Sequence, residues 1–230
     1  MLITMETRLD DATTEQFLAV YRDSFAPLED KAAARQSLTD DEFRDEMHHT
    51  SVLKFVAWDE SGHPAAIAFV ATDLSVVPWI SIPYYATRFP EQFARGVIYY
   101  FGALLVRPDH RGGTTSYKLL KELSRFTAMN GGIAAFDCCR FNEEAVKLPE
   151  LIAAVAREVC VVDPQQIDAQ RYYAYVTNGL REGYSTDPIP SVRDLVALGA
   201  EEGAVIDLVA LETEEAAQDA PRSKEHRSRA

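Results

Sequence analysis

The chain has few cysteines and no long apolar run. Its 230 residues include three cysteines, of which Cys138 and Cys139 are adjacent and Cys160 is remote. This spacing gives neither a CxxC pair nor a disulfide framework, which is typical of a reducing compartment. The longest apolar stretches, such as 65–71 and 101–106, fall far short of the ~20 residues that cross a bilayer. Because the N-terminus also lacks the basic start of a signal peptide, we expect a cytoplasmic protein without a membrane partner.

Several catalytic motifs are missing as well. The chain has no GxxxxGKS or GxxxxGKT segment, which excludes a P-loop NTPase, and no GxSxG segment, which excludes the nucleophile elbow of an α/β-hydrolase. It has no HExxH and no Cys/His cluster at zinc spacing, so we expect no metal.

Positive charge is scarce except in one segment. With 23 Lys and Arg against 36 Asp and Glu, the net charge of −13 argues against nucleic acid as a partner. The segment 107–125 differs, because five basic residues there face two acidic ones: Arg107, Arg111, Lys118, Lys121 and Arg125 against Asp109 and Glu122. Such a local basic patch suits a nucleotide phosphate, whereas the acidic remainder attracts a cationic amine. A solvated helix face is the alternative for the lysines.

Periodicity predicts two helices and then a hairpin. Residues 13–16 (TTEQ) have the form of a capping box before an apolar stripe of helical spacing, and residues 39–42 (TDDE) repeat that signal. The runs 52–58 and 65–72 are typical of strands, and the segment 59–63 between them is rich in turn formers.

The segment 73–98 is dense in aromatic residues and proline, so we expect an insertion that is not a regular part of a sheet. Aromatic loops on a rigid scaffold commonly line ligand pockets, and Trp79, Tyr84 and Tyr85 are therefore predicted to form a substrate wall. A satellite hydrophobic cluster beneath a long loop is the alternative.

An apolar strand ending at Val106 is followed by a glycine-rich turn and a helix from about Thr114 that stops at residues 130–132 (NGG). The run 133–139 then reads as a buried strand, which makes a right-handed parallel βαβ unit. A ligand belongs at the carboxyl end of its first strand, where Arg111, Gly112 and Gly113 fall. Glycines and a free helix N-terminus favour an anion such as a pyrophosphate.

The rest of the chain is expected to close one domain. Asn142 is suited to cap a turn, and Pro149 to begin or kink an apolar helix. The run 171–177 is rich in strand formers, and the patterns at 191–198 and 204–211 predict a last helix and a last strand. We therefore expect one domain over 1–212 and a disordered polar tail over 213–230.

The order Val-x-Pro-x-x-Arg-Gly at 106–112, followed by an amphipathic helix, resembles the acyl-CoA signature of the GNAT N-acyltransferase superfamily. The resemblance implies an α/β fold with a single mixed, mostly antiparallel sheet, a central parallel βαβ unit and flanking helices. It also implies acetyl-CoA or another acyl-CoA as co-substrate, held by the following residues: Leu104, Leu105, Val106, Arg111, Gly112, Gly113, Thr114, Thr115, Ser116 and Asn142. Thr114 and Ser116 depart from the family's small residues, and Pro149 replaces its usual tyrosine acid.

Acyl transfer to an amine also needs a group that takes a proton. Asp137, at the end of the second parallel strand, and His110, beside the turn, are candidates for the base, and Tyr173 offers a phenol as acid. Each has a structural alternative, such as a solvated loop histidine or a packed strand tyrosine. We expect an N-acyltransferase that acts on a small-molecule or peptide amine; a non-catalytic acyl-CoA-binding module is the alternative, and the oligomeric state stays open.

Overall fold

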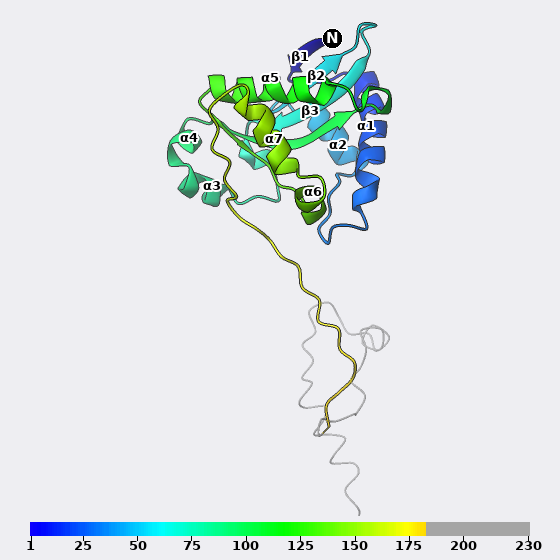
Figure 1. Cartoon of the computed structure of the whole chain (residues 1–230), viewed down its shortest axis with the longest axis vertical. Coiled ribbons are helices and arrows are strands. Elements are labelled where there is room, and N and C mark those ends of the chain that lie inside the picture. Colours follow the sequence, from blue (N-terminus) through cyan, green and yellow to red (C-terminus); the bar gives the residue numbers. More distant parts are fainter. Residues whose placement is uncertain (183–230) are drawn as a thin grey trace, which may run out of the picture. The chain divides into compact units, whose positions relative to one another are not determined.

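The computed structural model describes residues 1–182 and divides the chain into two units, Met1–Tyr172 and Tyr173–Ala230. The first unit contains the helices and strands described below (Figure 1). The run 171–177, expected to be strand-like, has no regular secondary structure, because β-propensity alone does not form a strand without a partner strand. The patterns at 191–198 and 204–211 and the tail 213–230 lie outside the described residues.

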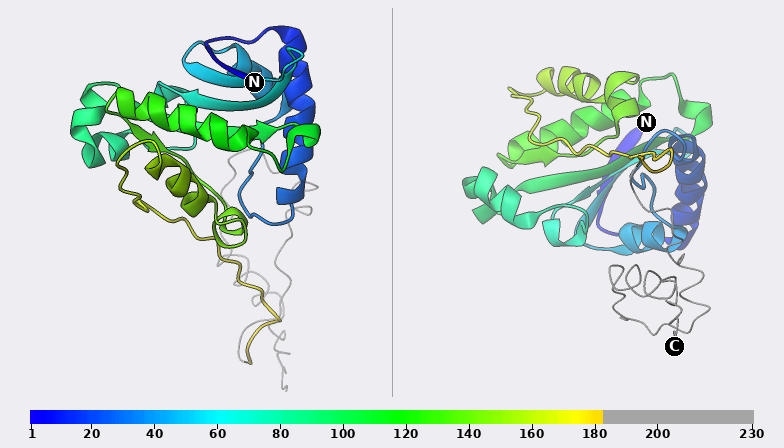
Figure 2. Two further views of the ribbon diagram at one scale, coloured as in Figure 1. Left: turned by 45° about the horizontal axis from the view of Figure 1, so that its top comes forward. Right: turned by 90° about the horizontal axis from the view of Figure 1, so that it is seen from below.

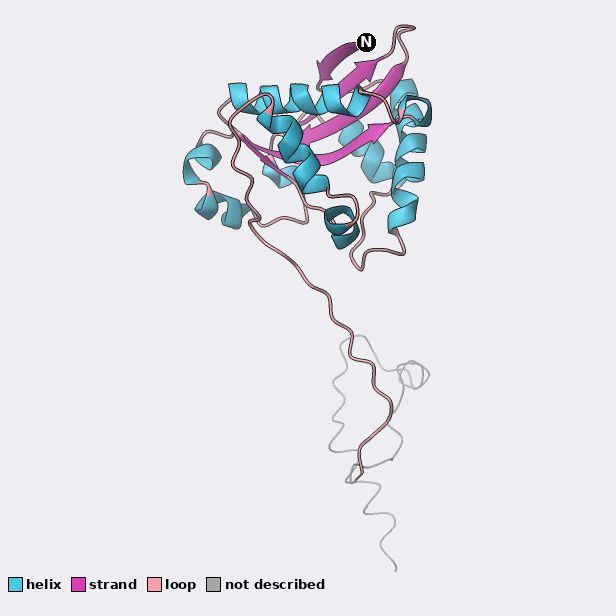
Figure 3. Ribbon diagram, viewed as in Figure 1, coloured by secondary structure: helices cyan, strands magenta, loops and turns pink. Residues whose placement is uncertain are grey.

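One five-stranded sheet forms the centre of the first unit (Figure 3). Its strands stand in chain order: β1 (Leu2–Glu6), β2 (Val52–Trp58), β3 (Pro64–Ala71), β4 (Ile98–Val106) and β5 (Ile133–Ala135). Neighbouring strands are antiparallel except for β4 and β5, which are parallel. This mixed sheet confirms the predicted fold class, and the strands at 52–58 and 64–71 confirm the predicted hairpin.

Helices cover both faces of the sheet, as the right-hand view of Figure 2 shows. Helices α1 (Asp11–Phe25) and α2 (Asp40–His48) pack on one face, where Phe17, Phe43 and Met47 are fully buried against β2 and β3. Helix α5 (Thr115–Met129) covers the other face, and α7 (Leu148–Arg157) packs beside α5. Since both faces are covered, every residue of β3 is buried.

The helix starts agree with the sequence at α2 but not at α1. Thr39 caps α2 in a capping box, with its Oγ1 accepting from the Glu42 amide at 3.3 Å and the Glu42 carboxylate accepting from the Thr39 amide at 2.7 Å. In α1 the cap is Asp10, whose carboxylate accepts from the Thr13 amide at 2.9 Å, and the expected capping box at 13–16 was wrong. Thr13 lies inside the first turn instead, where its hydroxyl also donates to Asp10.

The aromatic segment between β3 and β4 is helical rather than a sheet insertion, as expected. It contains η2 (Leu74–Val76), α3 (Ile82–Arg88) and α4 (Pro90–Ala94). Three more short elements complete the first unit: η1 (Ala26–Leu28), η3 (Pro108–His110) and α6 (Arg140–Glu144). Pro149 lies in the first turn of α7, as its chemistry predicts. Within residues 1–182, no helix is long and apolar enough to span a membrane.

Candidate functional site

The two parallel strands pair over three residues only. Their partners are Ile98 with Ile133, Tyr99 with Ala134 and Tyr100 with Ala135, after which β4 continues to Val106 without β5. The predicted strand 133–139 was therefore too long. From Phe101 onward, β4 is paired with β3 on one side, and on the other side no strand of the described residues accompanies it. This edge of β4 can bind an extended ligand through its backbone.

Gly102 is an extra residue in β4 at the point where the strands part. Phe69 pairs with Ala103 and the next residue, Val70, pairs with Phe101, so that Gly102 forms a β-bulge. A Cβ on Gly102 would lie 2.3 Å from Cε2 of Phe69, which only glycine avoids. Because a bulge bends its strand and increases the local twist, this one helps to turn β4 away from β5.

The turn after β4 leads directly into the N-terminus of α5. Gly112 has a φ of +76°, which favours glycine, and Thr114 at the N-cap position makes no hydrogen bond from its side chain to the helix. The first amides of α5 therefore have no side-chain cap and are suited to an anion. Together with Leu104, Leu105 and Val106 at the end of β4, the predicted residues from Arg111 to Ser116 form one continuous surface.

The Arg111 side chain binds protein atoms on the α1 side of this turn. Its Nε donates to the carbonyl of Val106 at 3.1 Å, and its Nη2 donates to Oγ of Ser24 in α1 at 3.2 Å. Arg111 thereby fixes the end of β4 to α1. The expectation that Asn142 caps a turn was wrong, because Asn142 lies within α6 and Cys139 is the N-cap residue.

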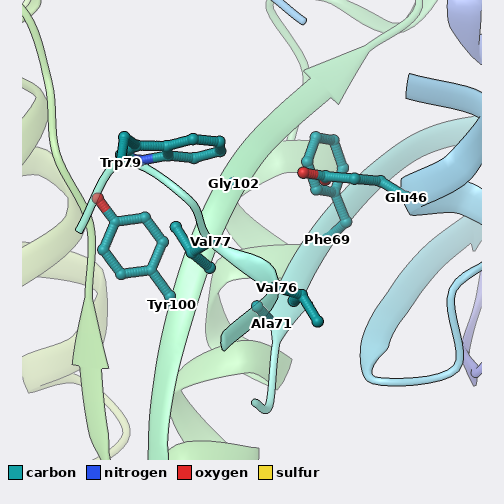
Figure 4. Close-up of a pocket in the computed structure, with 8 residues that line it drawn as sticks. All are labelled: Glu46, Phe69, Ala71, Val76, Val77, Trp79, Tyr100 and Gly102. Carbon is teal, nitrogen blue, oxygen red and sulfur yellow. The ribbon is translucent and has the colours of Figure 1, made fainter. Parts of the chain in front are cut away.

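A pocket lies beside the bulge, on the face of the sheet covered by α2. Its lining, drawn in Figure 4, comes from α2, β3, the 76–79 segment and β4: Glu46, Phe69, Ala71, Val76, Val77, Trp79, Tyr100 and Gly102. The Glu46 carboxylate and the Trp79 indole point toward one another from opposite sides of Gly102 (Figure 4). We call this site the Glu46 pocket.

Burial raises the pKa of Glu46 to about 7. The ammonium of Lys54 opposes that rise, and the carboxylate of Glu42, one turn earlier in α2, adds to it. Lys54 is fully buried in β2, where its Nζ donates to the carbonyls of Thr7 at 3.1 Å and His49 at 2.8 Å. A carboxylate with a pKa near neutrality can accept a proton at physiological pH.

Sequence reasoning missed Glu46. The signal was present, since Glu46 follows Phe43 by three residues and precedes Met47, and both of these lie on the buried stripe of α2. An acidic residue on an apolar stripe is an exception that requires a partner or a function.

The two predicted catalytic residues have different surroundings. Asp137 follows β5, and the hydroxyl of Tyr100 donates a hydrogen bond to its carboxylate. Burial and the neighbouring Asp137 carboxylate raise the pKa of Tyr100 above its usual range, so the phenol keeps its proton. Tyr173 belongs to the second unit, and its side chain is 74% exposed.

Of the three aromatic residues predicted as a substrate wall, only Trp79 lines the Glu46 pocket. Tyr85 is buried, and its ring lies edge-on to that of Tyr100 at 6.5 Å. The Tyr84 hydroxyl donates to the carbonyl of Ile167 at 2.5 Å. The satellite cluster considered as an alternative is thus present beneath this segment, with Ile98 and Tyr100 among its members.

No family model and no curated protein sequence matches the chain. Similar solved structures include a mutant of the BH1408 protein from Bacillus halodurans, with a TM-score of 0.44, 14% identity and coverage of 75% of this chain and 100% of that chain. An aminoglycoside acetyltransferase from an uncultured soil metagenomic sample, in complex with sisomicin, has a TM-score of 0.43, 15% identity and coverage of 75% and 97%.

A ribosomal-protein-alanine N-acetyltransferase from Brucella melitensis has a TM-score of 0.43, 14% identity and coverage of 75% and 100%. At these identities and TM-scores the likeness is confined to the fold. The GNAT-like fold predicted from the sequence rests on the strand order itself, with β4 and β5 parallel and α5 between them along the chain.

Proposed function

We propose that the chain is an acyl-CoA-dependent N-acyltransferase that transfers an acetyl or other acyl group to an amine. The observation that carries this proposal is the parting of β4 from β5 after Tyr100, with a helix N-terminus at one end of the free β4 edge and the Glu46 carboxylate beside its bulge. An extended thioester donor and an acceptor base would thus meet at Gly102.

In this proposal the donor lies along the free edge of β4. Backbone groups of Leu104, Leu105 and Val106 bind the pantetheine arm and polarise the acyl carbonyl. The amides from Arg111 to Ser116 bind the pyrophosphate at the start of α5, where the helix dipole favours negative charge. Asn142, which follows β5, remains a proposed contact of the same ligand.

The acceptor enters from the Glu46 pocket. Its nitrogen attacks the acyl carbon, a C–N bond forms, and the C–S bond breaks to release the CoA thiolate. Glu46 takes the proton that the nitrogen loses, directly or through one water. Asp137 holds the Tyr100 phenol in place at the pocket wall, and Tyr173 remains a prediction for the proton donor to the thiolate.

Binding and turnover test the proposal separately. Acetyl-CoA binding is measured by calorimetry, and thiol release is followed over a panel of amines. The variant Gly113→Val should abolish acetyl-CoA binding, because its side chain would stand where the pyrophosphate passes. The fold itself tolerates a side chain there, since a Cβ on Gly113 would lie 3.6 Å from the His110 carbonyl oxygen, an ordinary contact.

Three outcomes are distinct. Binding with thiol release supports the enzyme, and loss of both in folded Gly113→Val supports the placement of the donor. Saturable binding without thiol release from any amine would favour the non-catalytic acyl-CoA-binding module. Unchanged acetyl-CoA affinity in Gly113→Val would contradict the proposed donor site.

A further inference from the structure

The Glu46 pocket offers one negative charge to a ligand. Glu46 is the sole carboxylate among its eight lining residues. The Tyr100 hydroxyl is already a donor to Asp137, and the Trp79 indole N–H can donate but not accept. One ammonium group can therefore be neutralised here, and a second one cannot.

The remaining lining is apolar. Phe69, Ala71, Val76 and Val77 carry no side-chain polar atom, and Trp79 adds an indole that is 48% exposed. A second ammonium group on the ligand would lose its hydration against these side chains, at a cost that no partner in the pocket offsets. The nearby buried ammonium of Lys54, which acts on Glu46, would repel it as well.

The same surfaces favour a carbon chain or ring. Burial of apolar area contributes roughly 25 cal/mol per Å², so an alkyl or aryl group that reaches Val76, Val77 and Trp79 gains affinity. The Trp79 indole is suited to cover such a group, because its ring is not held in the core.

From these observations we infer that the acceptor is a primary monoamine with an alkyl or aryl body, rather than a diamine or polycation. This inference rests on the proposed function. The reaction it describes converts the amine and the acyl thioester into an N-acylamine and CoA thiol, with the amine proton passing to Glu46 and then to solvent.

Butylamine and putrescine form a matched pair for the test, because they have the same carbon chain and differ by one terminal ammonium group. With acetyl-CoA as donor, we expect the kcat/KM of thiol release for butylamine to exceed that for putrescine by about tenfold or more, since a buried unpaired charge is costly. Phenethylamine should also be used, whereas an aminoglycoside and an alanine-terminated peptide should be poor acceptors.

The variant Val76→Asp supplies the missing second charge. Val76 is half-buried, so a carboxylate at its position can remain partly hydrated. We expect the preference for butylamine over putrescine to fall by about tenfold in Val76→Asp, because the second ammonium group gains a partner. Met129→Asp is the matched control, since Met129 is 74% exposed at the end of α5 and does not line this pocket.

Each result decides the matter. An equal or higher kcat/KM for putrescine, or thiol release with the peptide or aminoglycoside alone, would overturn the monoamine inference and leave the N-acyltransferase standing. An unchanged preference in a folded Val76→Asp protein would also overturn it. Acetyl-CoA binding without thiol release from any of these amines would instead overturn the proposed function.

Discussion

Gly102 lies directly beneath the ring of Phe69, and a Cβ on Gly102 would come within 2.3 Å of Cε2 and 2.6 Å of Cδ2 of that ring. Phe69 is itself buried among residues of β2, β4 and α2, so the ring has little room to move. The bulge, the parting of β4 from β5 and the rim of the Glu46 pocket all depend on this close approach.

The variant Gly102→Ala should therefore be less stable than the wild type by about 1 to 3 kcal/mol, the usual range for overpacking. Denaturant unfolding measures the loss. The double variant Gly102→Ala with Phe69→Leu should recover part of it, and Gly113→Ala, where a Cβ meets no close atom, should change little. An equal stability of Gly102→Ala and wild type would show that the ring can move aside.

Replacement of the proposed base should affect turnover and not donor binding. We expect Glu46→Gln to lower kcat by about 10² to 10⁴, the contribution typical of a general base, with acetyl-CoA affinity unchanged. The neighbouring and exposed Asp45 supplies a control in Asp45→Asn, which should keep full activity. If both variants turned over at the wild-type rate, the proton would have to go to another group.

The same carboxylate should make stability depend on pH. The pKa of Glu46 is about 7 in the folded chain against an ordinary value of 4.5, so unfolded chains ionise first as the pH rises. The stabilising contribution is thus complete below about pH 4.5 and is lost as the pH passes through about 7, by roughly 2 to 3 kcal/mol. Glu46→Gln should remove this loss in unfolding measurements across that range. A parallel pH dependence in both proteins would contradict the raised pKa.

The fold could be read from the sequence because its signals are local. The hairpin turn, the Thr39 capping box and the glycine-rich turn before α5 each depend on neighbours in the chain, and the structure has all three. The Glu46 pocket depends on residues far apart in sequence, from α2, β3 and the segment before α3. Periodicity identifies the buried face of α2, but not the strand that lies opposite Glu46.

The end of β5 and the role of Tyr85 show the same limit. The run 133–139 continues the apolar pattern of a strand, yet pairing ends at Ala135, because the bulge at Gly102 turns β4 away. Tyr85 and Trp79 were equal candidates in the sequence, since aromatic character does not distinguish a core residue from a pocket wall.

Trp79 and Tyr85 should therefore respond differently to truncation. We expect Trp79→Ala to raise KM for an apolar amine severalfold, with little loss of stability, because its indole is about half exposed. Tyr85→Ala should destabilise the fold by about 2 to 4 kcal/mol, as is usual for a buried aromatic residue. Thermal unfolding and steady-state kinetics on both variants separate the two roles, and a purely thermal effect of Trp79→Ala would remove Trp79 from the acceptor site.

Lys54 should set the pH at which the proposed base works. Its ammonium lowers the pKa of Glu46, whereas burial raises it, and the two together give about 7. In Lys54→Met the opposing charge is gone, so the pKa of Glu46 should rise and the acidic limb of the kcat/KM profile should move to higher pH. The carbonyls of Thr7 and His49 would lose a donor, which costs about 1 to 3 kcal/mol of stability without moving that limb. Lys31→Met, at an exposed lysine, should leave the profile in place. An unmoved limb in folded Lys54→Met would show that Lys54 serves the fold alone.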